Sequence, residues 1–184
     1  MSLLLIILVL PIILVNCKPK IPEAKLGFWE EGEEEPTTFF DEFRMVSTRK
    51  GKVEWEYLAE TAKIYEKKNL AKSQKIKIIY KKDNGKISTL TAKKGILKTD
   101  TSDMLAEGDV VLISSRGVRL ETQLLNWDNA KKEFFTDLPV KLFREKDTLT
   151  GIGLKADSEL KKVKILSQVE VKVHSVDLGK DEED

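Results

Sequence analysis

The sequence is poor in cysteine and histidine, the residues that most often carry covalent and metal chemistry. Its 184 residues include one cysteine, Cys17, and one histidine, His174. A lone cysteine excludes an internal disulfide, so packing must stabilise the fold. One cysteine and one histidine are also too few for a typical zinc site and argue against a Cys-His catalytic pair. We therefore expect no metal, no cofactor and no enzymatic activity, and we expect His174 to be solvated or on an edge strand.

The chain also lacks an excess of charge of either sign. Lysine and arginine together number 32, against 31 aspartate and glutamate residues. Proteins that bind nucleic acid normally carry a basic excess on one face. The composition therefore argues against nucleic acid as a partner.

The long apolar run at the N-terminus is too short to be a comfortable membrane span. Residues 3–15 carry no charge, but a helix needs about 20 apolar residues to cross the bilayer core. The run fits the apolar region of a secretory signal peptide, and its end at Cys17 resembles a bacterial lipoprotein signal. We predict a signal peptide and lipoprotein anchor over residues 1–17, with lipidation of Cys17. The alternative is a short uncleaved anchor with an unmodified cysteine.

Composition divides the rest of the chain into three parts. Residues 18–38 contain three prolines and the acidic run 30–35, which predict an acidic flexible tether because too little apolar surface is available to fold alone. Residues 177–184 are typical of a solvated acidic tail. Residues 39–176 form the predicted folded domain, which is long enough for one hydrophobic core.

Alternation of apolar and polar residues predicts β-strands throughout this domain. Apolar residues alternate with glutamate over 53–59 and with lysine over 75–81, the period-two pattern of a half-buried strand. Asn84-Gly85 predicts a tight hairpin turn. The segment 59–70 is rich in Ala, Lys and Glu and could form a helix, but we predict a strand because the domain repeats.

The repeat has a period of about 30 residues. Triplets of the form apolar–any–small end at Ala59, Ala92, Thr122 and Ala156. A period of this size indicates one supersecondary unit that is stacked repeatedly. We expect an antiparallel sheet stack with an apolar concave face and unpaired strands at both ends.

Six segments of the predicted domain stand out in order along the chain: 49–59, LTAKKGIL at 90–97, MLAEGDV at 104–110, VRLETQLLNW at 118–127, FFTDLPV at 134–140 and LTGIGLKAD at 149–157. Together they resemble the LptC (YrbK) family of lipopolysaccharide-export proteins. The resemblance covers roughly residues 43–173. It implies an all-β fold, a twisted, boat-shaped β-jellyroll of stacked antiparallel strands (OstA/LptA-like) that is open at both ends.

The resemblance also implies partners and a location. Members of the family lie on the periplasmic side of the inner membrane. They take lipopolysaccharide from the transporter subunits LptF and LptG, driven by the ATPase LptB, and pass it through an apolar groove to the bridge protein LptA. The bridge is expected at the C-terminal sheet edge and the transporter at the N-terminal edge, both by strand addition. We expect this chain to be held at the inner membrane by Cys17 or by its short N-terminal segment.

The predicted site residues combine the strand pattern with this resemblance. The lipid-groove candidates are Ile76, Ile78, Val110, Leu112, Leu120 and Leu142. The partner-edge candidates are Val53, Trp55 and Tyr57 at the N-terminal edge and Val169, Val171 and Val173 at the C-terminal edge. Gly51 and Gly153 are predicted structural glycines, placed where a strand enters the sheet or bends.

Two other functions stay open from the sequence. A structural or adhesive surface lipoprotein would carry the same β-repeats without a lipid ligand. A soluble LptA-like bridge relative would share the fold, although the anchor and the single cysteine argue against it. An enzyme is disfavoured because no motif pairs the abundant Asp and Glu residues.

Overall fold

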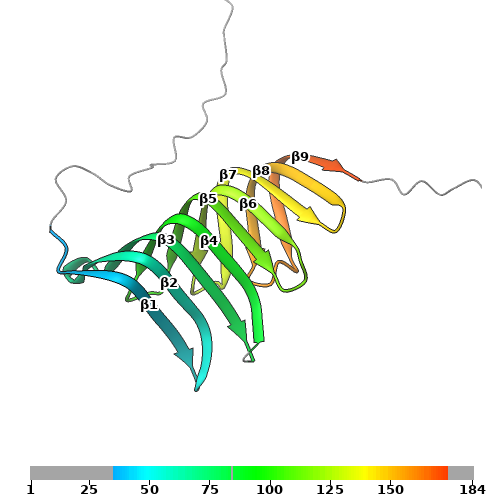
Figure 1. Ribbon diagram of the computed structural model, residues 1–184. Helices are drawn as coiled ribbons and strands as arrows, with labels where there is room; N and C mark the ends of the chain where they lie inside the picture. Colours follow the sequence, from blue (N-terminus) through cyan, green and yellow to red (C-terminus); the bar gives the residue numbers. More distant parts are fainter. Residues whose placement is uncertain (1–34, 84, 174–184) are drawn as a thin grey trace, which may run out of the picture. The chain divides into compact units, whose positions relative to one another are not determined.

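The computed structural model describes residues 35–83 and 85–173, and its strands form one antiparallel sheet in sequence order from β1 to β9 (Figure 1). The strands are β1 (Thr38–Arg49), β2 (Lys52–Tyr65), β3 (Leu70–Lys82), β4 (Gly85–Lys98), β5 (Met104–Ser114), β6 (Arg119–Asp128), β7 (Glu133–Arg144), β8 (Asp147–Asp157) and β9 (Val163–Lys172). The prediction of an all-β fold of stacked antiparallel strands is confirmed.

Several sequence predictions fall outside the described residues. These are the anchor over 1–17 with Cys17, most of the tether over 18–38, His174 and the tail over 177–184. Within the part of the chain that is described, no helix has the length and apolar character needed to cross a membrane.

The ambiguous segment 59–70 is mostly strand, as predicted. β2 continues to Tyr65, and a single 3-10 turn, η1 (Glu66–Lys68), then leads into β3 at Leu70. The predicted hairpin is also present, because Lys82 and Gly85 are paired at the ends of β3 and β4.

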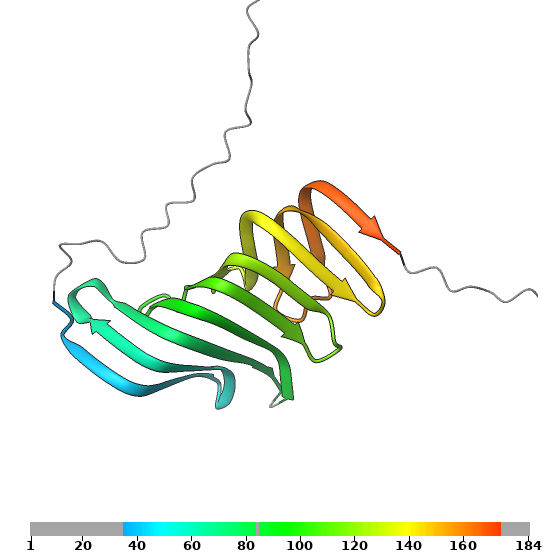
Figure 2. The ribbon, with the colours of Figure 1, turned by 45° about the horizontal axis from the view of Figure 1, so that its top comes forward.

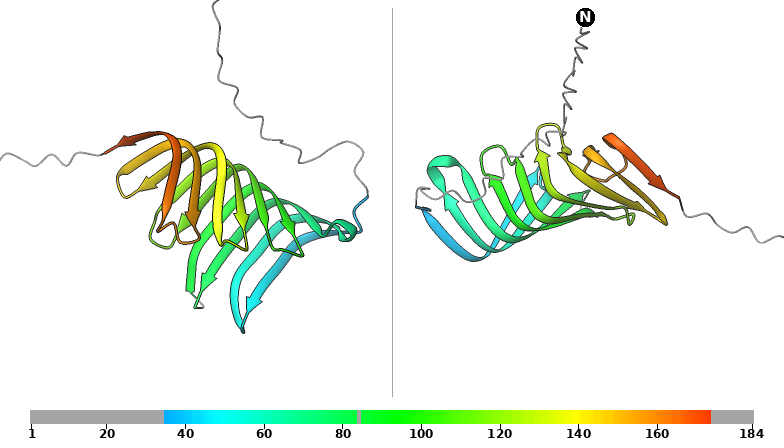
Figure 3. Two further views of the ribbon diagram at one scale, coloured as in Figure 1. Left: turned by 180° about the vertical axis from the view of Figure 1, so that it is seen from behind. Right: turned by 90° about the horizontal axis from the view of Figure 1, so that it is seen from above.

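A line of irregularities crosses the strands near their middle. Residues other than glycine with left-handed backbone angles lie there on four strands, namely Glu42 on β1, Lys75 on β3, Asp109 on β5 and Gln168 on β9. The pairing register also shifts in mid-strand in every pair from β4–β5 to β8–β9. Bulges of this kind bend a strand and increase its twist. The strands therefore curl along this line (Figures 2 and 3).

The line divides the sheet into two half-sheets. The first half-sheet ends in the turns after Arg49, Lys82, Ser114 and Arg144, and the second ends in the turns after Tyr65, Lys98, Asp128 and Asp157. Side chains of the two halves meet, because the Tyr80 ring of the first lies 5.1 Å from Trp127 and 5.2 Å from Phe134 of the second. We call the region between the half-sheets the trough, and we call the side where their turns approach each other its open side.

The structure corrects the predicted N-terminal edge. Val53, Trp55 and Tyr57 lie on β2, which pairs with β1 on one side and β3 on the other. Trp55 and Tyr57 are core residues, 3% and 0% exposed. The prediction that these three residues form the edge is therefore wrong, and β1 is the edge strand. The reason is physical: the left-handed Glu42 interrupts the alternation on β1 that would have revealed a strand.

The two glycines singled out in the sequence both have backbone angles that favour glycine. Gly51 has φ +75° in the turn between β1 and β2, and Gly153 has φ +74° at the bend of β8. A Cβ atom at Gly153 would also lie 2.9 Å from Leu166 Cδ1. A side chain at either position would be strained.

Candidate functional site

One row of apolar side chains runs along the whole first half-sheet. Each member is the cross-strand partner of the next, so every strand contributes one residue. From β1 to β9 the row is Met45, Tyr57, Ile78, Leu90, Leu112, Leu120, Leu142, Leu149 and Val171. Cross-strand neighbours of this kind are the unit of packing on a sheet face. The row therefore forms an unbroken apolar wall of the trough.

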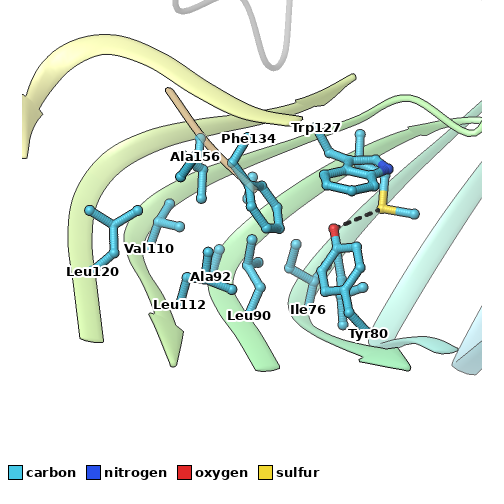
Figure 4. Close-up of a cluster of buried hydrophobic side chains, with 14 of the residues drawn as sticks. Ile76, Tyr80, Leu90, Ala92, Val110, Leu112, Leu120, Trp127, Phe134 and Ala156 are labelled. Atoms are coloured by element: carbon cyan, nitrogen blue, oxygen red, sulfur yellow. Dashed lines mark hydrogen bonds between the residues drawn. The ribbon is translucent and has the colours of Figure 1, made fainter. Parts of the chain in front are cut away.

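A second row lines the opposite wall. It runs from β2 to β9 through Ile64, Ala71, Leu97, Met104, Trp127, Phe134, Ala156 and Val163. Figure 4 shows members of the two half-sheets pointing toward one another, with Trp127 and Phe134 opposite Leu90 and Tyr80. The Tyr80 hydroxyl donates a hydrogen bond to Met104 Sδ at 3.7 Å. Burial raises the pKa of the Tyr80 phenol, so this hydroxyl remains protonated.

Exposed apolar side chains lie at both ends of the sheet. At the β9 end Val169, Val171 and Val173 are 53%, 55% and 70% exposed, whereas the middle of the first row is almost fully buried. At the β1 end Phe40 is 42% exposed, and its ring lies 5.7 Å from that of the partly buried Phe43. The apolar interior thus reaches solvent at both ends of the described sheet.

The predicted groove residues all lie in the trough wall. Ile76, Ile78, Val110, Leu112, Leu120 and Leu142 are between 0% and 3% exposed. Four of the six belong to the first row, and Ile76 and Val110 lie beside it. In this structure they pack against the opposite wall, so an occupant would have to separate the half-sheets.

The sequence reading missed much of the second wall and the β1 end. The sequence analysis did not identify Trp127, Phe134, Phe40 or Phe43 as lining residues. Trp127 and Phe134 nevertheless lie at the centre of the core. The signal available was the alternation Leu125–Trp127 and Phe134–Thr136, which is out of phase with the alternation of the first wall on β6 because the register shifts between Thr122 and Asn126.

Ion pairs join the two half-sheets across the open side of the trough. Lys82 Nζ, at the end of β3, lies 2.8 Å from Glu159 Oε1, in the loop between β8 and β9. Lys132 Nζ, between β6 and β7, lies 3.5 Å from Glu54 Oε2 on β2. Hydrogen bonds from Lys161 and Lys82 lower the pKa of Glu159 to about 2. This carboxylate therefore stays charged at neutral pH and in mild acid.

The lining of the site is apolar. Among residues 35–83 and 85–173, no group of three or more His, Cys, Asp or Glu side chains could hold a metal ion. Charged side chains lie at the rim, such as Lys81, which pairs with Glu56. The arrangement suits long aliphatic chains with charged groups at its border.

The β9 end presents a strand edge as well as apolar side chains. β9 pairs with β8 and β1 pairs with β2, and neither has a second partner in the described sheet. Unpaired backbone N–H and C=O groups on such strands can pair with a strand of another chain. The C-terminal candidates Val169 and Val171 lie on this edge strand, and Val173 follows it directly.

Comparisons with known proteins agree with this geometry. The family model described as lipopolysaccharide-assembly, LptC-related, matches residues 3–174. No curated protein matches the chain in sequence. The crystal structure of LptH from Pseudomonas aeruginosa, the LptA homologous periplasmic component of the conserved lipopolysaccharide transport device, has a similar fold, with a TM-score of 0.55 and 11% identity over 66% of this chain and 95% of that one. The chain belongs to the LptC-related family of lipopolysaccharide-assembly proteins, a transport family of the periplasm and inner membrane.

Proposed function

We propose that the trough carries the acyl chains of lipopolysaccharide, received from the inner-membrane transporter LptF/LptG with its ATPase LptB and passed to the bridge protein LptA. The observation that carries this proposal is the first apolar row, which crosses all nine strands from the partly buried Met45 on β1 to the exposed Val171 on β9. An interior that reaches solvent at both ends suits a ligand that enters from one neighbour and leaves toward another.

The energetics suit a lipid with several chains. Each buried CH₂ group contributes about 0.8 kcal/mol, so even part of one acyl chain in the trough would give useful affinity. The phosphorylated head would stay outside, near rim lysines such as Lys81 and Lys82. Because the walls now contact each other, the lipid replaces contacts between side chains rather than filling an empty cavity.

We further propose that strand addition links the neighbours, with LptA on β9 and the transporter's periplasmic domain on β1. Exposed Val171, the last residue of the first row, and exposed Phe40 on β1 would then contact apolar side chains of the partner. In this arrangement the chain is held at the inner membrane through lipidated Cys17 or the short N-terminal segment.

Photo-crosslinking tests the lipid path directly. A photoreactive residue at Leu112 or Leu120 in the full chain, expressed in a lipopolysaccharide-producing cell with the transporter and bridge, is expected to give a lipopolysaccharide adduct because both positions line the trough. Ile113 is the matched control, since it follows Leu112 but faces outward and is 40% exposed. Equal labelling at Leu112, Leu120 and Ile113, or none at the two leucines, would contradict lipid binding in the trough.

The C-terminal edge can be tested separately by replacing Val171 with proline. Proline removes a backbone N–H and is poorly tolerated where strands pair, so co-purification of LptA is expected to fall by about tenfold or more. The circular dichroism of the full chain should change little, because Val171 lies next to the end of β9. Val171→Thr is the control that keeps the strand preference and the N–H group; unchanged LptA binding by the proline variant would refute docking at this edge.

A further inference from the structure

The loop between β8 and β9 has a conformation that it maintains with its own hydrogen bonds. The Asp157 carboxylate accepts hydrogen bonds from the backbone N–H groups of Glu159 at 3.1 Å, Lys161 at 2.8 Å and Lys162 at 3.1 Å. The Leu160 N–H donates to the Asp157 carbonyl oxygen at 3.1 Å. Residues 157–162 thus form a compact unit that could move as one piece.

Leu160 anchors this loop in the core at a conformational cost. Its backbone has a left-handed φ of 52°, which is unfavourable for a leucine, and such strain persists only where the surroundings enforce it. Its side chain is 0% exposed and belongs to the same hydrophobic cluster as the trough walls. Burial of the Leu160 side chain therefore offsets the backbone strain. The observed position of the loop, which we call closed, is favoured only by the small difference between these two effects.

An ion pair holds the loop to the other half-sheet. Glu159 reaches Lys82 at the end of β3, 77 residues away in sequence, and thereby joins the turn ends of the two half-sheets. Lys82 is 61% exposed, so water and salt weaken this pair. Water or salt can therefore replace this contact.

A hollow in the surface lies beside this loop. This hollow of about 320 Å³ lies at the open side, with Trp55, Tyr80 and Trp127 in its lining together with Ser158 and Glu159 of the loop. Among the described residues, the indole N–H groups of both tryptophans are buried without a hydrogen-bond partner. Buried polar groups are normally satisfied, so two unpartnered donors lie next to the hollow.

We propose that residues 157–162 are a latch on the open side of the trough, held shut by Leu160 and the Glu159–Lys82 pair, and that its release admits acyl chains sideways between the half-sheets. The second half of this statement rests on the proposed function, whereas the first does not. Sideways entry lets a lipid with a bulky polar head insert its chains while the head stays in water. Passage through the ends alone would require the whole molecule to follow the axis of the sheet.

Acrylamide quenching of tryptophan fluorescence tests the latch without any lipid. In the full chain with Trp29→Phe, the remaining emitters are Trp55 and Trp127, which both line the hollow beside the loop. Lys82→Glu, which places like charges together, and Leu160→Gln, which removes the apolar anchor, are expected to raise the quenching constant about twofold or more. Circular dichroism melting confirms that each variant is folded at the temperature of the measurement.

Lys52→Glu is the matched control. The Lys52–Asp83 pair has the same 2.8 Å separation as the Lys82–Glu159 pair and is also exposed, but it joins two turns of the first half-sheet and does not cross the open side. Its quenching constant should equal that of the parent. Unchanged quenching in both folded latch variants, or an equal rise in Lys52→Glu, would overturn the latch.

Uptake of fluorescently labelled lipopolysaccharide tests whether acyl chains enter sideways between the half-sheets. Leu160→Gln, which leaves the rim lysines in place, should bind the lipid about two- to fivefold faster than the parent, because the closed population is smaller. Raised quenching with an unchanged uptake rate would overturn sideways entry. If the parent binds no lipopolysaccharide at all, the proposed function fails, and the quenching result still decides whether the latch exists.

Discussion

Replacing Phe134 with alanine is expected to lower the free energy of unfolding by about 3–5 kcal/mol, the usual cost of truncating a buried aromatic residue. Phe134 is 0% exposed, and its ring lies 4.8 Å from Trp127 and 5.2 Å from Tyr80. It therefore joins the two walls of the trough, and its loss leaves a cavity that stiff neighbouring strands cannot fill. Urea unfolding of the full chain, followed by circular dichroism, measures the change.

Phe135→Ala provides the control on the adjacent residue. Phe135 faces the outer side of the sheet, pairs with Asn126 and Lys155, and is only partly buried. Its truncation should cost roughly 1 kcal/mol, in proportion to the smaller area buried. Equal costs for the two substitutions would contradict the placement of the core between the half-sheets.

The second large effect is expected at Gly95, in the second half-sheet. A Cβ atom there would overlap the Tyr57 hydroxyl and lie 2.7 Å from Ile76 Cδ1. Both neighbours are almost fully buried and belong to the opposite wall. Gly95→Ala should therefore force the half-sheets apart and lower the free energy of unfolding by about 3 kcal/mol, the upper part of the range for overpacking.

Gly85→Ala is the matched substitution on the same strand. A Cβ atom at Gly85 would meet only the Lys82 carbonyl oxygen at 3.5 Å, an ordinary contact. We expect its unfolding midpoint in urea to lie within experimental error of the parent. If Gly95→Ala were equally harmless, the close approach of Tyr57 to the second half-sheet would be refuted.

Local alternation of apolar and polar residues was enough to predict the fold class, but it does not show how long each strand is. On β3 the buried positions change phase between Ser73 and Ile76, and on β4 they change phase between Ala92 and Gly95. A period-two pattern that changes phase within one strand reads as two shorter segments. The bulges that bend the sheet therefore hide the length of the strands in the sequence.

The regularity of the alternation also decides which residues of the trough walls could be predicted from the sequence. The first wall keeps a regular alternation, so Ile78, Leu112 and Leu120 could be identified as inward-facing residues. The N-terminal edge could not be located, because β1 carries the left-handed Glu42 in mid-strand. The ion pair between Lys82 and Glu159 was also beyond reach, since nothing local relates two charged residues 77 positions apart.

The neighbour-to-neighbour strand order has a consequence for cooperativity. Each strand pairs with the strands adjacent in sequence, as in repeat proteins, whose stability is a sum of units and the interfaces between them. The terminal units lose one interface, so β1 and β9 should exchange their amide hydrogens faster than β4 to β6. Ends that fray at low cost can accept a foreign strand while the centre remains intact, and the short sequence separation between paired strands lets the sheet re-form quickly after each exchange.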